Sequence, residues 1–286
     1  MSLNILNTTE TMSVETFEFL SHLTEARLGI RMPFSKKGML ESRLCKRMKA
    51  LQCGTYDQYA QRLRDDLQEF LHFTDAITTN KTDFFREQEH FELLTSAVIP
   101  QILPLLHQQQ LRVWSAASSS GEEPYTLAIV LNEFFREHTQ ECQGQNPLFS
   151  VFATDVSQAM VAHGRKGVYS ESSFASIPST FQSQYFNRSV SHNPITYRVK
   201  PSLRQRVRFQ CLNLMDASYA LAHRYHVIFC RNVLIYFKRE TQHQVLRRLV
   251  QYLVPGGFLF LGHAESLAGH NLPLENWGSA VYRKQL

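Results

Sequence analysis

The feature that most constrains the fold of this chain is a change of hydrophobic period near residue 105. Beyond it, short and almost continuously apolar segments recur, and helical patterns follow the first, second and fourth of them. Strands of this kind that alternate with helices are typical of a parallel sheet covered on both faces. The last segment, WGSAVYRKQL, is predicted to close the sheet as an edge strand. The other predicted strands comprise residues 111–117, 149–155, 207–213, 225–232 and 256–263.

Up to about residue 80 the apolar residues instead recur three and four positions apart, which indicates helices. A first helix is expected to stop at Gly29, and a third to run through TYDQYAQRLRDDLQEFLHFTDAIT. The second, KGMLESRLCKRMKALQC, carries an apolar stripe that is expected to face a core. The stripe consists of Leu40, Leu44, Met48 and Leu51.

Residues 165–206 interrupt the alternation of strands and helices, because they are polar, contain proline turns and include a strand-like ITYRV. We predict that they form an inserted antiparallel β-subdomain. The whole pattern therefore predicts an α/β fold with a doubly wound sheet over residues 89–286. An all-α domain and its linker are predicted to precede it, over residues 1–88.

Composition places the chain among ordinary globular proteins, because 43% of its residues are hydrophobic and only 19% are charged. No stretch approaches the roughly 18 uncharged apolar residues that a membrane helix needs. The 5 cysteines form no CxxC pair, so we expect neither a disulfide framework nor a structural metal site. A reducing, cytoplasmic location is the expectation that follows, without insertion into a membrane.

Ligands of doubly wound sheets bind beyond the carboxyl ends of the strands, so a site is expected there. The first strand runs into SAASSSGEEPY, where small residues allow close approach of a ligand and Gly121 allows an unusual turn. Glu123 follows at the start of a helix, where pairing with the helix dipole explains an acidic residue without any ligand. The second strand ends in Asp155, which suits the hydroxyls of a ribose but equally suits the cap of the next helix.

The third and fourth predicted strands also end in side chains that suit a nucleoside. Asn213 can pair with an adenine edge while Leu214 covers the face of the ring. Arg231 and Asn232 follow the fourth strand, in CRNVLIYF. Each of these residues alone is more often a turn residue, but suitable groups at four successive strand ends favour a common binding site.

Between the two halves lies TTNKTDFFRE, residues 78–87, which is rich in side-chain hydrogen-bond donors. We expect a loop that enters a helix. On propensity Phe84 and Phe85 are core residues, and Arg86 alone is equally compatible with a surface ion pair. Spacing therefore leaves the role of this segment open.

Positive charge is concentrated in residues 31–49, where Glu41 is the single acidic residue. On the predicted second helix, Arg43, Lys46 and Arg47 lie beside or opposite the apolar stripe and are expected to face solvent. A solvated helix face explains them; docking of an acidic partner is the functional alternative.

Several of these segments occur together in the order and spacing of one known family. They are TTNKTDFFRE, AASSSGEEPYTLA, ATD, the NL after the VRF strand, and CRNVLIYF. In them the chain resembles the CheR family of chemoreceptor glutamate methyltransferases, over nearly its whole length. The resemblance implies a Rossmann-like S-adenosylmethionine methyltransferase domain, with a small β-subdomain insertion and an all-α domain before it. It also implies methyl transfer from S-adenosylmethionine to glutamates of methyl-accepting chemotaxis proteins, with S-adenosylhomocysteine as product.

The resemblance gives roles to the matching positions. Arg86 and Tyr236 match residues thought to position the reacting carboxylate, although Tyr236 can also be a buried aromatic with a satisfied hydroxyl. The basic helix, with Arg43, Lys46 and Arg47, fits as a docking surface for the helical bundle of a receptor. The positions that match the cofactor site are Asn80, Thr82, Arg86, Glu123, Asp155, Asn213, Leu214, Arg231 and Asn232.

In some members of this family the β-subdomain docks a peptide from the receptor C-terminus. The turn FNRSVSHNPITYRV lacks the glycine-rich tip of those members, so the sequence does not favour this partner. We expect a monomer that binds no nucleic acid.

Three alternatives belong to other classes of protein. A nucleic-acid methyltransferase would need a base-flipping pocket and, for amino groups, an NPPY-like motif, and the sequence has none. A nicotinamide-dependent oxidoreductase is disfavoured because GxGxxG is missing. A cofactor-binding scaffold without turnover stays open. For the methyltransferase, a glutamate with a pKa of about 4.3 is already ionised at neutral pH, so no general base is expected.

Overall fold

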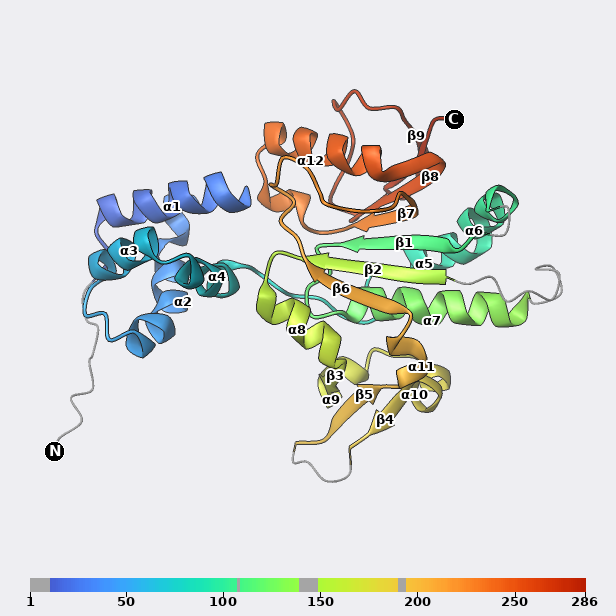
Figure 1. Cartoon of the computed structure of the whole chain (residues 1–286), viewed down its shortest axis with the longest axis horizontal. Coiled ribbons are helices and arrows are strands. Elements are labelled where there is room, and N and C mark those ends of the chain that lie inside the picture. The colour runs from blue at the N-terminus through green and yellow to red at the C-terminus, as the bar shows by residue number, and fades with distance from the viewer. Residues whose placement is uncertain (1–10, 107–108, 139–148, 190–193) are drawn as a thin grey trace.

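The computed structural model describes residues 11–106, 109–138, 149–189 and 194–286. A helical N-terminal unit lies beside a seven-stranded sheet that has helices on both faces, and a small three-stranded sheet lies near one edge (Figure 1). This architecture confirms the predicted fold class. Within the described residues, no helix has the length and apolarity that crossing a lipid bilayer requires.

The helices of the N-terminal unit begin and end at residues with recognisable capping conformations. The first helix stops as predicted at Gly29, whose φ of 72° is the left-handed conformation that glycine adopts without strain. The predicted third helix is in fact two, because Asp66 leaves the helical conformation and caps the second of them by accepting from the backbone N–H groups of Gln68 and Glu69. The elements are α1 (Val14–Leu28), η1 (Phe34–Lys36), α2 (Lys37–Ala50), α3 (Tyr56–Asp65) and α4 (Leu67–Ile77).

The core of this unit uses the predicted stripe of α2. Leu40, Leu44 and Met48 are fully buried, against aromatic side chains that include Tyr59 and Phe73. Leu51 is only partly buried, because α2 ends at Ala50 and Leu51 already lies in the turn that follows.

A run of short helices leads from the helical unit into the large sheet. These are α5 (Glu89–Leu93), the π-helical turn η2 (Leu94–Val98), α6 (Ile99–Ile102) and η3 (Leu103–Leu105). The sheet has the order β6-β2-β1-β7-β8-β10-β9, in which the first five strands are parallel. Its strands are β1 (Leu111–Ala116), β2 (Phe149–Asp155), β6 (Val207–Cys211), β7 (Tyr225–Cys230), β8 (Leu253–Leu261), β9 (Leu274–Gly278) and β10 (Val281–Lys284).

The end of the chain differs from the prediction. The segment predicted as one edge strand contributes to two, and β10 pairs with both β8 and β9. The edge is therefore β9, because a tight turn through Ser279 and Ala280, both at positive φ, folds the chain back on itself.

The central strands β1, β7 and β8 are buried on both faces, as their continuous apolar sequences predict, whereas β6 at the edge exposes Arg208 and Cys211. Val113 and Phe229 belong to the core on one face, together with residues of α7, whereas Trp114 and Ile228 belong to the core on the other, together with residues of α12. The helices that follow β1, β2 and β7 are α7 (Glu122–Glu137), α8 (Gln158–Lys166) and, after the turn η4 (Leu234–Tyr236), α12 (Arg239–Tyr252).

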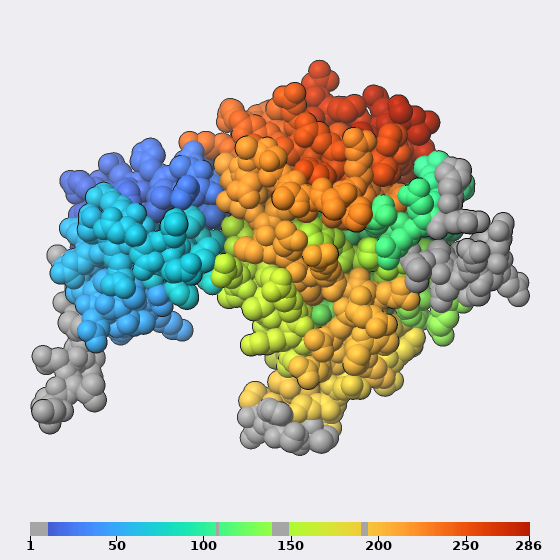
Figure 2. Space-filling model, viewed as in Figure 1, coloured from blue at the N-terminus to red at the C-terminus, as the bar shows by residue number. Residues whose placement is uncertain are grey.

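The insertion forms the predicted antiparallel subdomain, with strand order β3-β5-β4. Residues 190–193 of its turn, and Cys142, lie outside the described residues. Figure 2 shows an open notch between the helical unit and this subdomain. The elements are β3 (Val168–Ser170), α9 (Glu171–Phe174), α10 (Ser179–Tyr185), β4 (Phe186–Arg188), β5 (Thr196–Val199) and α11 (Pro201–Arg204).

Candidate active site

One cavity lies where the strand order reverses between β1 and β7, at strand ends that point toward the helical unit (Figure 1). This is the place where doubly wound sheets bind ligands. The volume of the cavity is about 1190 Å³ when the part that is open to solvent is included. Residues of the helical unit, such as Leu28 and Met39, also line it. Every residue predicted for cofactor binding or catalysis lines it: Asn80, Thr82, Arg86, Glu123, Asp155, Asn213, Leu214, Arg231, Asn232 and Tyr236.

The ends of β1 and β2 are tied together by Asp155. Its carboxylate accepts from the backbone N–H of Ser119 at 2.8 Å and from that of Ser157 at 2.9 Å. The side-chain cap of α8 is Ser157, whose hydroxyl accepts from the N–H of Met160, so Asp155 does not serve as that cap. Burial raises the pKa of Asp155, although backbone N–H groups act in the opposite direction.

The loop after β1 is tightly bent. Ala117 and Ser119 have positive φ, and Gly121 has a φ of 102°. A Cβ at Gly121 would lie 2.8 Å from the Tyr169 hydroxyl oxygen, so the position requires glycine. The Ser118 hydroxyl of this loop is buried and has no hydrogen-bond partner among residues 11–106, 109–138, 149–189 and 194–286.

Glu123 interacts with specific side chains in addition to the dipole of its helix. Its Oε1 accepts from the Ser115 hydroxyl at 2.7 Å, and its Oε2 lies 3.5 Å from Nη1 of Arg231. Burial raises the pKa of Glu123, and the positive charge of Arg231 opposes that rise. Arg231 also lies 3.1 Å from Glu87 and donates to the carbonyl oxygen of Arg86. Its side chain is 1% exposed, and two of its nitrogens, Nε and Nη1, make no hydrogen bond within the part of the chain that the structure describes.

The two predicted catalytic residues face the same cavity from different segments. Arg86 is half-buried, and its Nη1 donates to the carbonyl oxygen of Lys81 at 3.0 Å. Tyr236 is also half-buried, and its carbonyl oxygen accepts from the N–H of Arg31 in the helical unit. Among the described residues no hydrogen bond satisfies the Tyr236 hydroxyl, which disfavours the alternative of a buried, satisfied tyrosine.

Two asparagines of the site, Asn80 and Asn213, already make hydrogen bonds within the protein. Asn213 donates from its amide to the carbonyl oxygen of Arg27 at 2.7 Å and accepts from the N–H of Met215. The carbonyl oxygen of Asn80 accepts from the Ser119 hydroxyl at 2.9 Å. Both asparagines therefore join separate segments around the cavity as well as lining it.

Sequence reasoning did not find Glu265, which follows β8 and accepts four hydrogen bonds from backbone N–H groups. The signal was available, since GHAES occupies the end of the fifth parallel strand, where ligand-binding or supporting residues are expected.

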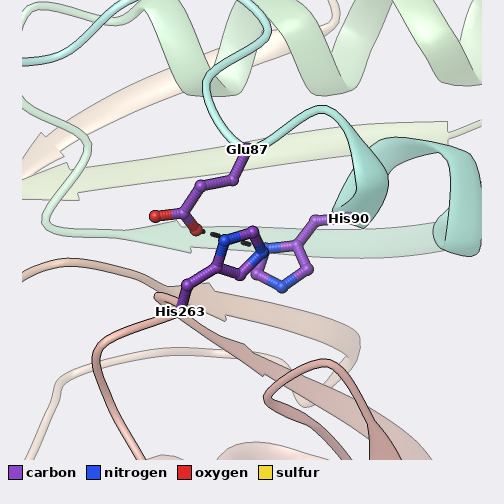
Figure 3. A group of neighbouring side chains, drawn as sticks. All are labelled: Glu87, His90 and His263. Atoms are coloured by element: carbon purple, nitrogen blue, oxygen red, sulfur yellow. Dashed lines mark ion pairs between the residues drawn. The ribbon is translucent and has the colours of Figure 1, made fainter.

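A group of potential metal ligands was also missed. Figure 3 shows Glu87, His90 and His263 with their side chains turned toward one another, and their ligand atoms lie within 4.8 Å of each other. Nε2 of His90 lies 2.7 Å from the carbonyl oxygen of Ser279, and its Nδ1 lies 3.5 Å from Oε2 of Glu87. Nη2 of Arg231 lies 3.1 Å from that same oxygen, so a guanidinium already supplies positive charge to the carboxylate.

The expectation that three cations of α2 face solvent holds for Lys46 alone. Nε of Arg47 donates to both oxygens of the buried Glu69, at 2.8 Å each. Arg43 donates to the carbonyl oxygens of Ile77 and Thr78 at the end of α4. These two arginines are half-buried because the acidic and carbonyl groups of α4 pack against α2, a contact that the sequence of α2 does not reveal.

Comparison with known proteins gives the family. The family model described as the CheR methyltransferase SAM binding domain matches residues 80–283, and that of the CheR methyltransferase all-alpha domain matches residues 15–78. The domain boundary at residue 88 stays a prediction.

Relatives match over most of the chain. Chemotaxis protein methyltransferase 1 of Pseudomonas aeruginosa is 37% identical over 90% of this chain and 91% of its own length. Methyltransferase 2 of the same organism is 36% identical, over 89% and 87%. The chemotaxis protein methyltransferase of Escherichia coli is 32% identical, over 97% and 94%. The chain belongs to the CheR family of chemotaxis protein methyltransferases, whose catalytic domain binds S-adenosylmethionine.

Proposed function

We propose that this protein transfers the methyl group of S-adenosylmethionine to glutamate side chains of bacterial chemoreceptors, forming glutamyl methyl esters for sensory adaptation. One observation carries the proposal: residues predicted from separate segments of the chain all line a single cavity. The relatives are named chemotaxis protein methyltransferases, and the family resemblance supplies the glutamate acceptor. The proposed partner places the reaction in the cytoplasm.

The lining of the cavity fits the cofactor. Among the described residues, the Ser118 hydroxyl and Nε and Nη1 of Arg231 are buried and make no hydrogen bond, as expected where a polar ligand completes the hydrogen bonds. Asp155 accepts from the backbone N–H groups of Ser119 and Ser157, and a third, that of Val156, also acts on it; a carboxylate has about four acceptor positions, so a ribose hydroxyl can still bind. We assign the cofactor site to Asn80, Thr82, Arg86, Glu123, Asp155, Asn213, Leu214, Arg231 and Asn232.

The bound cofactor supplies a methyl group on a positively charged sulfur. A carboxylate oxygen of the acceptor glutamate forms the new bond to the methyl carbon as the carbon–sulfur bond breaks, and the electron pair stays on sulfur. No proton moves, because the acceptor is ionised at neutral pH. What this chain must provide is alignment and exclusion of water, which can lower the barrier by several kcal/mol.

Arg86 and Tyr236 are the proposed catalytic residues. Arg86 can hold one acceptor oxygen through a charge-assisted hydrogen bond, while the Tyr236 hydroxyl, which no described residue engages in a hydrogen bond, can donate a weaker one. Two donors on one carboxylate fix its direction of attack. A single tight ion pair would instead reduce its nucleophilicity.

We assign receptor docking to the basic face of α2. The contacts of its cations indicate that they contribute to docking in different ways. Lys46 is exposed and available to a glutamate-rich helical bundle, and Lys49 lies exposed beside it. Arg43 and Arg47 bind groups of α4. They support docking indirectly, because they fix the position of α2 and of its exposed lysines. A monomer is the proposed state.

The experiment that tests the function is transfer of a radiolabelled methyl group from S-adenosylmethionine to chemoreceptor membranes, read as base-labile label. Wild-type protein is expected to label the receptor band. Arg86→Ala should lower the rate by about 100-fold or more, since it removes a charged orienting group. Arg62→Ala, on the exposed face of α3, should leave it unchanged. Base-stable label, or cofactor binding without any transfer, would contradict the proposal.

A further inference from the structure

The carboxylate of Glu265 holds two loops together behind the wall of the cavity. Its Oε2 accepts from the backbone N–H groups of Asn232 at 2.8 Å and Gly262 at 2.7 Å. Its Oε1 accepts from Leu234 at 2.7 Å and Ile235 at 3.3 Å. Glu265 is 7% exposed, so these four bonds form away from bulk water, where an unmade one is costly.

Within the described part of the chain, the loop after β7, which Glu265 holds, has no acceptors of its own for these backbone N–H groups. After β7 the chain turns through Asn232 in a left-handed conformation, with φ of 58°, and then enters the short turn η4. The first N–H groups of such a turn have no partner within it, so Glu265 caps η4 from a distant segment. A Cβ at Gly262 would lie 2.4 Å from Nδ2 and 2.9 Å from the backbone nitrogen of Asn232, which shows how closely the two loops pack.

The same loop presents Arg231, Asn232 and Tyr236 to the cavity. On its other side, Glu87 accepts from the Asn232 amide at 3.0 Å and pairs with Arg231. Glu265 holds the backbone of this loop, while Glu87 holds its side chains.

We infer that Glu265 is a positioning residue for methyl transfer, which fixes the backbone from Asn232 to Ile235 and thereby places the Tyr236 hydroxyl against the acceptor carboxylate. The inference rests on the proposed function and extends it to a residue outside the cavity lining. Arg31 holds the carbonyl oxygen of Tyr236 from the helical unit, so the tyrosine is fixed from both ends.

The test is a double-mutant cycle. Glu265→Gln preserves shape, but its amide nitrogen faces two of the four N–H donors, so kcat is expected to fall roughly 10- to 100-fold. In the Tyr236→Phe background the same change should lower kcat less than about threefold, because no hydroxyl remains to be displaced. Equal losses in both backgrounds would overturn the inference. Glu275→Gln, an exposed carboxylate on β9, is the matched control and should change neither rate.

A second measurement needs no methyl transfer. The chain has 11 tyrosines, and fluorotyrosine labelling gives each a ¹⁹F resonance, with that of Tyr236 identified by its loss in Tyr236→Phe. The Tyr236 resonance should shift or broaden in Glu265→Gln and stay in place in Glu275→Gln. An unchanged resonance in Glu265→Gln overturns the inference even if no receptor is labelled, whereas absence of transfer by wild-type protein contradicts the proposed function alone. If Glu265→Gln fails to fold, Glu265→Asp, which keeps the charge, is measured in the same way.

Discussion

At the scale of single residues, burial shifts the pKa values of several carboxylates near the cavity. Burial raises the pKa values of Glu123, Asp155 and Glu265, and hydrogen bonds from backbone or side-chain donors oppose the rise. Glu122 is the clearest case: it is 5% exposed, accepts from the Ser120 hydroxyl, and has a pKa raised to about 7.

Glu122→Gln is expected to remove part of the pH dependence of folding stability. Because the folded pKa of about 7 lies above the ordinary value of 4.5, the folded state binds the extra proton between them. The free energy of unfolding of wild-type protein therefore falls as pH rises through this window, by at most roughly 3 kcal/mol from this group. Urea denaturation at pH 5 and pH 8 measures the difference. Glu137→Gln, at the exposed end of α7, should retain the wild-type slope, and an equal slope in Glu122→Gln would refute the assignment.

The sequence predicted site residues correctly where they lie at the carboxyl ends of parallel strands. Asp155, Asn213 and Arg231 follow separate parallel strands whose carboxyl ends meet at one edge, so they were expected to share a site, and they line one cavity. Glu265 follows such a strand too, but it acts on backbone N–H groups of another loop. Its partners Asn232 and Leu234 carry no sequence pattern that marks a missing acceptor.

At the scale of elements, the contact between α2 and α4 includes one buried carboxylate. Glu69 is 1% exposed and accepts from Arg47 and from the Tyr59 hydroxyl at 2.9 Å. Glu69 raises the pKa of Arg47 through the hydrogen bond between them. Burial and the separate hydrogen bond from the Tyr59 hydroxyl to Glu69 raise the pKa of Tyr59 above its ordinary range. The three residues therefore act as one unit that joins three helices.

Arg47→Ala is expected to destabilise the protein by about 3 kcal/mol, because it leaves the Glu69 carboxylate buried without its cation. Lys46→Ala, one position away and exposed, should change stability by less than about 0.5 kcal/mol but raise KM for the receptor. Thermal unfolding and receptor methylation separate the two effects. If Lys46→Ala unfolded the helical unit, or Arg47→Ala left its stability intact, the division of roles on α2 would be wrong.

Periodicity predicted which face of α2 is buried but could not show where its cations find partners. The stripe of Leu40, Leu44 and Met48 follows from local spacing, whereas Arg47 meets Glu69 across the fold. The same limit explains the missed break between α3 and α4, since Asp66 continues the helical pattern in sequence and ends it only through its capping conformation.

At the scale of the whole molecule, the cavity is completed by the contact between the two domains. Lys238 pairs with Glu25, and Asn213 donates to Arg27 at the end of α1. Ile30 forms an isolated bridge with Phe237, directly after the proposed catalytic tyrosine. The order of domains was predictable from the two hydrophobic periods, but this contact was not, because it joins single residues about 200 positions apart.

Gly29→Ala is the substitution that tests this contact. The position needs a φ of 72°, and a Cβ there would lie 2.5 Å from the sulfur of Met215 and 3.1 Å from the ring of Phe237. We expect a loss of about 1–3 kcal/mol in the free energy of unfolding. Affinity for S-adenosylmethionine should fall several-fold as well, because Phe237 and the neighbours of Gly29 line the cavity.

Gly38→Ala is the matched control for this change. Within α2 its Cβ would meet nothing within 4 Å, so helix propensity predicts a gain of about 0.5–1 kcal/mol and unchanged cofactor affinity. Denaturation and calorimetric titration with S-adenosylmethionine measure both quantities in both variants. A Gly29→Ala protein that is less stable yet binds the cofactor like wild type would mean that the helical unit covers the cavity without shaping it. Weaker binding in Gly29→Ala alone would establish that the fit between the domains sets the geometry of the site.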